Sequence, residues 1–389
     1  DDRPLLKIKL NKNLRRSILR GHPWIYREAI AQPPKVEIAQ MVCVLDSKGD
    51  ELGWAIYDPH GPLSLRMLSL EKKPPNTAYF DKQLQRALDL RKNLNLENTT
   101  AFRLINGEAD FLPGLVCDIY GPTAVLQFDG RGPSEFWEKP HIAGWIFKNA
   151  GIQSVVEKSR RNAEGELKTL AGSPSAPILQ IRENGVAFNV DIDKGQKTGF
   201  FLDQRDNRQY VRTISRGKSM LNLFSYTGGF SVYAGLGGAS KVASLDVAEG
   251  AIRSAEENWL LNGLPREKHE GLAVDVFEYL NSADEKWDHV IVDPPSMGHS
   301  EEQKQRAILK YTELFAASAK RVVPGGQLSL SSCSSHISFE DFFEITREAL
   351  SQARRRGQIL RVSGQAPDHP FLHSSHEQRY LKFVHLVLI

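Results

Sequence analysis

Four side chains stand out for their chemistry and for their positions after apolar runs. Asp246 ends the run in "SLDVAEG", Asp275 follows one in "AVDVF", Asp293 follows one in "IVDPP", and Cys333 lies in "SLSSCSSHIS". A carboxylate accepts hydrogen bonds from hydroxyl and amino groups, and a cysteine thiolate is an effective nucleophile. For each acid alone the alternative is a helix N-cap, which aspartate favours. For the thiol the alternative is a small buried residue at a strand end.

These residues belong to the last 200 residues, in which apolar runs alternate with amphipathic ones. Residues 219–238 read as a strand, a glycine turn and a helix, and residues 241–263 as a strand and a helix that buries Ile252, Ala255 and Trp259 and stops at Gly263. Residues 301–326 read as a long helix ended by Pro-Gly-Gly, followed by the strand that leads to Cys333. This alternation predicts an α/β fold with a doubly wound, mainly parallel sheet, whose ligands bind outside the carboxyl ends of the strands.

Two smaller domains are predicted ahead of this one. Residues 41–68 alternate three apolar runs with turn residues, which indicates a small β-rich domain over residues 1–72. "EKKPPNTA" reads as a linker, and residues 80–94 as a helix with Asp81 in its first turn and with its apolar face on Leu84, Ala87 and Leu88. A hairpin at residues 114–128 and a helix and strand at residues 141–159 then predict an α+β middle domain over residues 76–184, which leaves residues 185–389 for the α/β domain.

The turn "FSYTGGF" that follows the first strand of the α/β domain helps to distinguish between possible nucleotide-like ligands. A dinucleotide fingerprint GxGxxG is absent, and only Gly228 and Gly229 are clustered, so the cradle for a pyrophosphate is thin. S-adenosylmethionine carries an adenosine without a pyrophosphate and fits such a turn better. Asp246, 18 residues after Gly228, is then expected to accept from both ribose hydroxyls, and Asp275 to meet the adenine edge.

Several motifs, taken in order, resemble one known family. "GQKTGFFLDQRDNR" (195–208), "LNLFSYTGGFSV", "SLDVAEGAI", "HVIVDPP" and "SSCS" are similar to the RlmI-type 23S ribosomal RNA cytosine-5 methyltransferases, which have the class I S-adenosylmethionine-dependent, Rossmann-like fold. "RRSILRGHPWIYREAI" resembles the start of their PUA-like RNA-binding domain, so the resemblance spans essentially the whole chain. It implies a cofactor site that contains Gln196, Thr198, Phe201, Gln204, Phe224, Tyr226, Gly228, Asp246, Asp275, Asp293 and Pro294. Without it, residues 195–208 read as a glycine-containing turn and the charged start of a helix.

The same resemblance gives Cys333 a catalytic role. Carbon 5 of a pyrimidine becomes nucleophilic when a thiolate adds to carbon 6, and such chemistry needs a cysteine near the donated methyl group. Asp293 is expected to accept from the amino group of cytosine, and Ser296, unlike an aromatic residue, does not stack on a base. The serines around the thiol are expected to supply donors that stabilise the thiolate. His336 either assists it or is a helix-cap or surface residue.

The N-terminal region indicates contact with RNA. The first 40 residues hold nine Lys or Arg against four Asp or Glu, and we expect Lys12, Arg15, Arg16 and Arg20 to bind phosphates. For the nearby aromatic Trp24, packing in the core of the β-rich domain is the favoured interpretation. His369, His373 and His376 are not expected to hold a metal, because "PDHP" prevents a helix and no cysteine or acid completes a ligand set.

The composition is that of an ordinary globular protein. The chain has 389 residues, 41% of them hydrophobic and 25% charged, a formal net charge of +3 and three widely spaced cysteines, Cys43, Cys117 and Cys333. Neither a membrane span nor a signal peptide is expected, which indicates a cytoplasmic protein. We therefore predict an S-adenosylmethionine-dependent methyltransferase for cytosine carbon 5 of large-subunit ribosomal RNA, and leave open a homodimer. Two alternatives remain: methylation of another RNA atom with Cys333 structural, and a ribosome-assembly protein that binds RNA without turnover.

Overall fold

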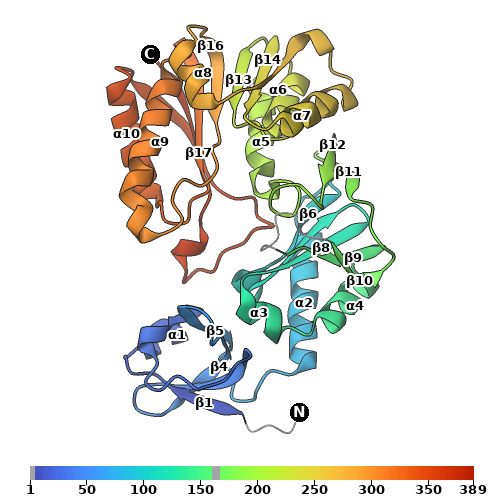
Figure 1. Ribbon diagram of the computed structural model, residues 1–389, viewed down its shortest axis with the longest axis vertical. Coiled ribbons are helices and arrows are strands. Elements are labelled where there is room, and N and C mark those ends of the chain that lie inside the picture. Colours follow the sequence, from blue (N-terminus) through green and yellow to red (C-terminus); the bar gives the residue numbers. More distant parts are fainter. Residues whose placement is uncertain (1–4, 160–166) are drawn as a thin grey trace. The chain divides into compact units, whose positions relative to one another are not determined.

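The computed structural model describes residues 5–159 and 167–389, so the first four residues of the predicted β-rich domain lie outside the described residues. The chain divides into two compact units (Figure 1). Unit 1 comprises Asp1–Arg182, Val190–Leu202 and Pro367–His376, and unit 2 comprises Glu183–Asn189, Asp203–Ala366 and Glu377–Ile389. The boundary divides the motif at residues 195–208, whose first part belongs to unit 1 and whose helix belongs to unit 2.

The N-terminal part of unit 1 is a five-stranded sheet in the order β1-β3-β4-β5-β2. Its strands are β1 (Leu6–Lys9), β2 (Trp24–Tyr26), β3 (Gln40–Leu45), β4 (Glu51–Tyr57) and β5 (Leu63–Ser69), with the short helix α1 (Arg15–Leu19) between β1 and β2. The three strands predicted between residues 41 and 68 are confirmed. Alternate residues such as Val42 and Val44 point into one core with Ile8, Ala55 and Leu65, because side chains alternate along a strand.

A second five-stranded sheet follows in unit 1, in the order β10-β9-β8-β7-β6. Its strands are β6 (Ala101–Asn106), β7 (Leu115–Tyr120), β8 (Thr123–Phe128), β9 (Ser154–Glu157) and β10 (Lys168–Gly172), and its helices are α2 (Thr77–Lys92), α3 (Arg131–Phe136) and α4 (Lys139–Asn149). Leu84, Ala87 and Leu88 are buried as predicted. The predicted start of α2 is wrong, because the Asn76 side chain accepts a hydrogen bond from the Tyr79 amide (2.9 Å) and caps the helix earlier.

Unit 2 is built on a seven-stranded sheet in the order β15-β14-β13-β16-β17-β19-β18. Its strands are β13 (Ser219–Leu223), β14 (Lys241–Asp246), β15 (His269–Ala273), β16 (Trp287–Val292), β17 (Val322–Ser332), β18 (Gly357–Ser363) and β19 (Lys382–Leu388), while β11 (Ile178–Glu183) and β12 (Val186–Asp191) form a separate hairpin. Strands β13 to β17 are parallel, and β19 runs antiparallel between β17 and β18. The order reverses between β13 and β16, which is where open α/β sheets bind ligands.

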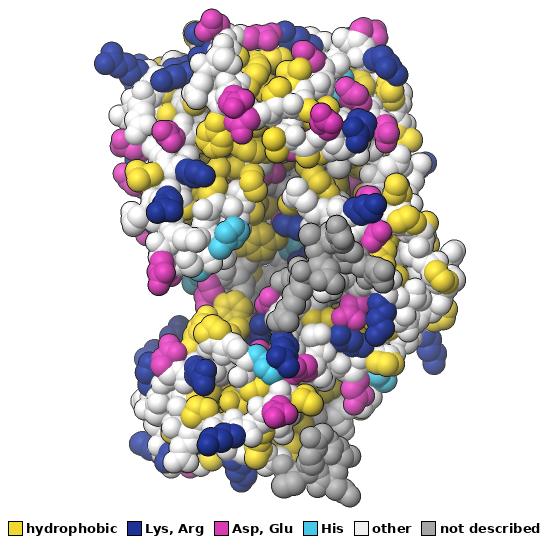
Figure 2. All heavy atoms as spheres, in the orientation of Figure 1, with side chains coloured by type: hydrophobic (Ala, Val, Ile, Leu, Met, Phe, Trp, Pro, Cys, Tyr) yellow, Lys and Arg dark blue, Asp and Glu magenta, His cyan; other side chains and the backbone are white. Residues whose placement is uncertain are grey.

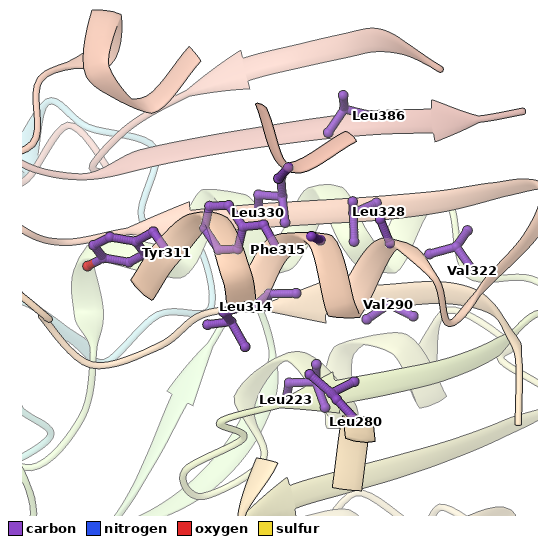
Figure 3. Packing of buried hydrophobic residues seen from close by; sticks show 14 of the residues in the cluster. Leu223, Leu280, Val290, Tyr311, Leu314, Phe315, Val322, Leu328, Leu330 and Leu386 are labelled. Carbon is purple, nitrogen blue, oxygen red and sulfur yellow. The ribbon is translucent and has the colours of Figure 1, made fainter. Parts of the chain in front are cut away.

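Helices cover both faces of this sheet, as predicted. Helices α8 (Val276–Ser282), α9 (Lys304–Ala319) and α10 (Phe339–Gln352) pack on one face, where Figure 3 shows Tyr311, Leu314 and Phe315 of α9 against Leu328 and Leu330 of β17. The other face carries Met220, Val242 and Ile291, which pack with residues of α5 (Arg205–Thr213), α6 (Gly229–Leu236) and α7 (Glu249–Leu261). Burial on both sides explains why these strands read as continuous apolar runs.

The end of α9 differs from the prediction. The helix stops at Ala319, where the Arg321 amide donates to the Ser318 carbonyl (3.0 Å) in a tighter turn, and Val322 already pairs with Trp287. Pro324, Gly325 and Gly326 therefore lie inside β17, at a register shift relative to β16. A side chain at Gly326 would stand 2.8 Å from Val322 Cγ1, which explains why the irregular segment has glycine there.

Candidate active site at the carboxyl edge of unit 2

The turn after β13 has an unusual backbone. Phe224, Tyr226 and Gly228 have φ angles of 59°, 49° and 84°, a region that non-glycine residues rarely adopt. The turn is held from the neighbouring strand, because the Ser225 amide donates to the Leu245 carbonyl (2.9 Å). Gly228 is required, since an added Cβ would lie 2.9 Å from Ala255 Cβ in α7. The backbone of this turn can therefore approach a ligand closely.

Asp246 ends β14 as predicted and fixes this turn. Its Oδ2 accepts from the Tyr226 amide and its Oδ1 from the Ala248 amide, both at 3.0 Å. A carboxylate has about four acceptor positions, so two bonds leave capacity for the hydroxyls of a ligand. The carboxylate is thus oriented by backbone donors on two sides before any ligand arrives.

Two valines beside the acids were missed from the sequence. Val247 follows Asp246 and is 71% exposed, and Val274 precedes Asp275 and is 37% exposed. The Val274 amide donates to the Asp246 carbonyl (3.0 Å), which brings the two segments together. Apolar side chains left open next to a carboxylate suit a ligand with a flat ring and a hydroxylated sugar. The sequence signal that could have identified them is an apolar residue directly beside each strand-end acid.

Asp275 lies two residues beyond the end of β15 and forms the N-cap of α8. Its Oδ1 accepts from the Glu278 amide (3.0 Å), so the helix-cap alternative accounts for its type and position. The cap does not test the predicted contact with adenine, because it occupies a single acceptor position on the side chain.

Asp293 directly follows β16 and is held by Gln204. The Gln204 amide nitrogen donates to Asp293 Oδ1 (3.2 Å) and to Ser331 Oγ (3.0 Å), and its oxygen accepts from Asn207 (2.7 Å). Gln204 is almost fully buried, and it links the carboxyl ends of β16 and β17. Pro294, next in the chain, is buried as well.

Cys333 follows the last residue of β17 and is partly exposed. The surrounding serines are engaged elsewhere: Ser331 donates to the Lys382 carbonyl (2.9 Å), Ser332 to the Tyr311 hydroxyl (3.1 Å) and Ser334 to the Gly298 carbonyl (3.0 Å). These three hydroxyls are buried and fasten the strand end to β19, α9 and the loop after β16. The run is polar because the strand end needs these bonds, a reason that differs from the predicted supply of donors to the thiol.

The other two thiols are sealed in cores. Cys43 is 2% exposed and Cys117 is fully buried, and burial raises the pKa of both thiols, that of Cys117 well above 9.0. His336 lies with its Nδ1 3.3 Å from Glu301 Oε1, which matches the surface alternative considered for it.

The first half of the motif at residues 195–208 is anchored within unit 1. Thr198 is fully buried and donates to Asp118 Oδ2 (2.6 Å), with the Tyr120 hydroxyl 2.7 Å from its Oγ1. The Lys197 ammonium lies 4.6 Å from the centre of the Phe201 ring, and Gln196 is exposed. These contacts give Thr198 a role in holding the loop that the sequence did not indicate.

The N-terminal cations are at the surface. Lys12, Arg15, Arg16 and Arg20 are all exposed, and Arg15 forms an ion pair with Asp46 (3.1 Å). In Figure 2, separate Lys and Arg side chains lie among acidic and apolar ones over the region where Figure 1 labels β1 and α1.

Trp24, which lies close to these cations in sequence, is half-buried and not enclosed in the core of the β-rich domain as predicted. Its indole nitrogen donates to Glu108.

Neither a metal cluster nor a membrane helix is found in the part of the chain that the structure describes. Within residues 5–159 and 167–389, no three His, Cys, Asp or Glu side chains come together as ligands. His369, one of the three histidines considered from the sequence, is buried with its Nδ1 3.2 Å from Asp368. Over the same residues, every helix is too short or too polar to span a bilayer.

Comparisons with known proteins point in one direction. A family model described as S-adenosylmethionine-dependent methyltransferase matches residues 142–361, and a PUA-like domain model matches residues 8–70. The chain is 36% identical to a ribosomal RNA large subunit methyltransferase of Deinococcus radiodurans, over 98% of this chain and 97% of the relative. It is also 36% identical to the ribosomal RNA large subunit methyltransferase I of Photobacterium profundum, over 96% and 97%.

Solved structures agree. A putative S-adenosylmethionine-dependent methyltransferase from Streptococcus mutans superposes with a TM-score of 0.87 at 25% identity, covering 98% of this chain and all of that one. A structure of a putative methyltransferase complexed with SAH gives the same values. The family resemblance, the fold class and the cofactor predicted from the sequence are confirmed.

Proposed function

The chain belongs to the S-adenosylmethionine-dependent methyltransferase family, and we propose that it methylates carbon 5 of a cytosine in large-subunit ribosomal RNA through a covalent adduct with Cys333. The names of its relatives suggest the substrate class. The observation that carries the finer proposal is the position of Cys333. It is partly exposed directly after β17, at the sheet edge where Asp246 and Asp293 end or follow parallel strands.

The carboxyl edge of unit 2 fits S-adenosylmethionine. We assign the ribose to Asp246, the close backbone approach to the turn Phe224–Gly228, and the adenine ring to the apolar surface of Val247 and Val274 beside Asp275. The turn lacks the glycines that a pyrophosphate needs, which suits a ligand without one. By the family resemblance, Pro294, which directly follows Asp293, completes the proposed site within unit 2.

The thiol provides the activation that carbon 5 lacks. The thiolate of Cys333 adds to carbon 6, and the electron pair of the 5,6 double bond moves to carbon 5, which becomes nucleophilic. When bound, S-adenosylmethionine would supply the electrophilic methyl group that carbon 5 takes up, and the electron pair of the broken methyl–sulfur bond would stay on the sulfur of the departing S-adenosylhomocysteine. A base then removes the carbon 5 proton, the C–H electron pair restores the double bond, and the sulfur–carbon 6 bond breaks to release the thiolate.

Asp293 favours cytosine over uracil in this proposal. A carboxylate accepts from the exocyclic amino group of cytosine, whereas uracil presents a carbonyl at the same position. Gln204 orients the carboxylate by donating to its Oδ1. Ser296, two residues after the first proline, uses its hydroxyl on the Gly298 carbonyl (3.2 Å) and offers no ring to stack on an extruded base.

The N-terminal domain is proposed to hold the RNA. Its exposed cations Lys12, Arg16 and Arg20 lie in the segment matched by the PUA-like model. Each phosphate that such a cation contacts adds to the affinity for RNA and makes that affinity more sensitive to salt. The target cytosine has to be unpaired or extruded, because a base inside a duplex hides carbon 5 and carbon 6 from a thiol.

A direct test transfers a labelled methyl group to ribosomal RNA that lacks modifications and identifies the product nucleoside by mass spectrometry. We expect 5-methylcytidine at one position of the large-subunit RNA. A different methylated nucleoside would refute the carbon 5 assignment and favour the alternative in which Cys333 is structural. Cofactor binding without label in RNA would favour a protein that binds RNA without turnover.

A further inference from the structure

A buried lysine lies directly opposite the end of the strand that leads to Cys333. Lys382 is the first residue of β19 and pairs with Ser332, the last residue of β17, in the antiparallel register. Its side chain is fully buried. No sequence pattern singles it out, because it begins an apolar strand 49 residues beyond the cysteine.

The Lys382 ammonium holds the segment that begins at Cys333. It donates to the carbonyl of Ser334 (2.6 Å), to that of Ile337 (2.6 Å) and to that of Tyr380 (2.7 Å). An ammonium has three donors, so these bonds use all of them. Two of the three acceptors lie one and four residues after the cysteine, so the lysine links the two ends of the turn at residues 333–337.

The charge of this lysine is not cancelled by a bonded acid. Over the residues that the structure describes, all three hydrogen bonds of Lys382 go to backbone carbonyls and no carboxylate lies within ion-pair distance of it. Burial lowers the Lys382 pKa to about 8, while the negative forms of Cys333 and Asp341 act to raise it. The attraction is mutual, so a cation that is stabilised by a thiolate also stabilises that thiolate.

We propose that Lys382 is a positioning residue for Cys333, which fixes the turn that carries the sulfur and stabilises its thiolate through a buried positive charge. The inference rests on the proposed function, since it gives the nucleophile the activation that a free thiol lacks. An unperturbed thiol has a pKa near 8.5, and a neighbouring cation lowers it.

Among the residues that the structure describes, three other ionisable groups near Cys333 do not supply this charge. Tyr311 on α9 accepts from Ser332, and its pKa, raised to about 12 mainly by burial, keeps it neutral. Asp293 after β16 is negative and opposes the thiolate. Asp341 on α10 is negative too, but it is paired with Lys304 (3.1 Å) and with the N-cap of its own helix.

The test measures the rate of Cys333 alkylation by iodoacetamide from pH 5 to pH 9.5, with the modified peptide identified by mass spectrometry. In the wild-type protein we expect the rate to titrate at least one pH unit below the ordinary thiol value. Lys382→Met should move this midpoint upward by at least one unit, a change of about tenfold in the rate at pH 7. Lys382→Arg, which keeps the charge, should move it less.

Lys218→Met is the matched control, because burial lowers the pKa of Lys218 as well, and this lysine directly precedes β13, at the amino ends of the parallel strands and away from the carboxyl edge near Cys333. It should leave the Cys333 profile unchanged. An unchanged profile in Lys382→Met, or a wild-type midpoint at or above the ordinary value, would overturn the inference. The wild-type midpoint decides the question even if Lys382→Met fails to fold.

This test needs neither RNA nor cofactor, so its outcome is separable from that of the proposed function. Methylation retained by a Cys333→Ala variant would end the covalent mechanism whatever the thiol pKa. A variant without activity, together with a thiol insensitive to Lys382, would refute only the role of the lysine.

Discussion

Cys117 on β7 and Cys333 directly after β17 both lie near buried charged groups, but those groups are paired differently in the two regions. On β7, Cys117 is followed by Asp118, which forms an ion pair with Arg103 (2.8 Å), while Arg91 pairs with Asp110 (2.6 Å) nearby. The positive and negative groups cancel in pairs. Cys117 is fully buried beside them, and burial together with the Asp118 charge raises the pKa of its thiol well above 9.0. This thiol stays protonated and inert.

After β17 the balance is reversed. Cys333 is partly exposed, and the buried group opposite its strand end is the Lys382 cation, whose bonds go to backbone carbonyls. Burial near charge therefore does not by itself activate a cysteine. Exposure of the sulfur and the influence that we propose for the Lys382 cation distinguish the second thiol from the first.

The largest effect is expected from removing each thiol in turn. Cys333→Ala should lower kcat/KM for methyl transfer by about 1000-fold or more, because no other group can form the bond to carbon 6. Cys117→Ala should leave the activity of the folded protein within about twofold. Rates of label transfer to RNA check both. A fully active Cys333→Ala protein would remove the distinction between the two cysteines.

The pairing of charge on β7 predicts a large effect on stability. Asp118→Asn should lower the free energy of unfolding by about 3 kcal/mol, because Arg103 would lose the negative charge of this carboxylate at a mostly buried site. Chemical denaturation measures the change. Glu285→Gln, which breaks the exposed ion pair with Lys241, is the control and should change stability little. Equal effects of the two substitutions would contradict the view that the buried ion pair of Asp118 with Arg103 stabilises the fold more than an exposed pair does.

The strands on either side of β17 sharpen the contrast further, because each places a neutral histidine against Ser329: His289 on β16 and His385 on β19. Ser329 lies between His289 Nε2 (2.8 Å) and His385 Nδ1 (2.7 Å), and burial lowers the pKa of His385 to about 4 and that of His289 well below 6.5. The unfolded chain binds more protons than the folded one between pH 4 and 6.5. The contribution of these two neutral histidines to the free energy of unfolding is therefore fully present above pH 6.5 and is lost as the pH falls towards 4.

We expect each buried histidine to contribute about 1.4 kcal/mol per pH unit inside this window. Urea unfolding at pH 5 and pH 6.5 measures the slope, and His385→Gln should reduce it. A slope unaffected by this substitution would indicate that acidic groups alone govern the pH dependence.

Much of the catalytic unit was predictable from local pattern. The strand and helix periods of residues 219–334 are regular, and Asp246, Asp293 and Cys333 follow apolar runs, so their common sheet edge could be inferred. Helix ends were less accessible: the cap at Asn76 was hidden in a segment read as a linker, and the Pro-Gly-Gly after α9 lies within a strand. In both cases a local signal was overridden by a hydrogen bond or a strand pairing.

Contacts between distant segments could not be predicted. Thr198 reaches Asp118 across 80 residues, and Lys382 faces Ser332 only because β19 inserts antiparallel beside β17. Neither residue has a neighbour in sequence that reveals its partner. The exposed Val247 and Val274 could have been noticed, since an apolar residue adjoining a strand-end acid was visible in both motifs.

The covalent role of Cys333 is tested most directly by trapping. A substrate RNA with 5-fluorocytosine at the target position carries fluorine in place of hydrogen at carbon 5. A base cannot remove fluorine as it removes a proton, so the covalent adduct should not resolve. We predict a protein–RNA complex that survives denaturation and forms only with S-adenosylmethionine. Peptide mapping should identify Cys333 as the residue that is bonded to the RNA. Methylation of normal RNA combined with no such complex, or a complex that persists in Cys333→Ala, would contradict the account.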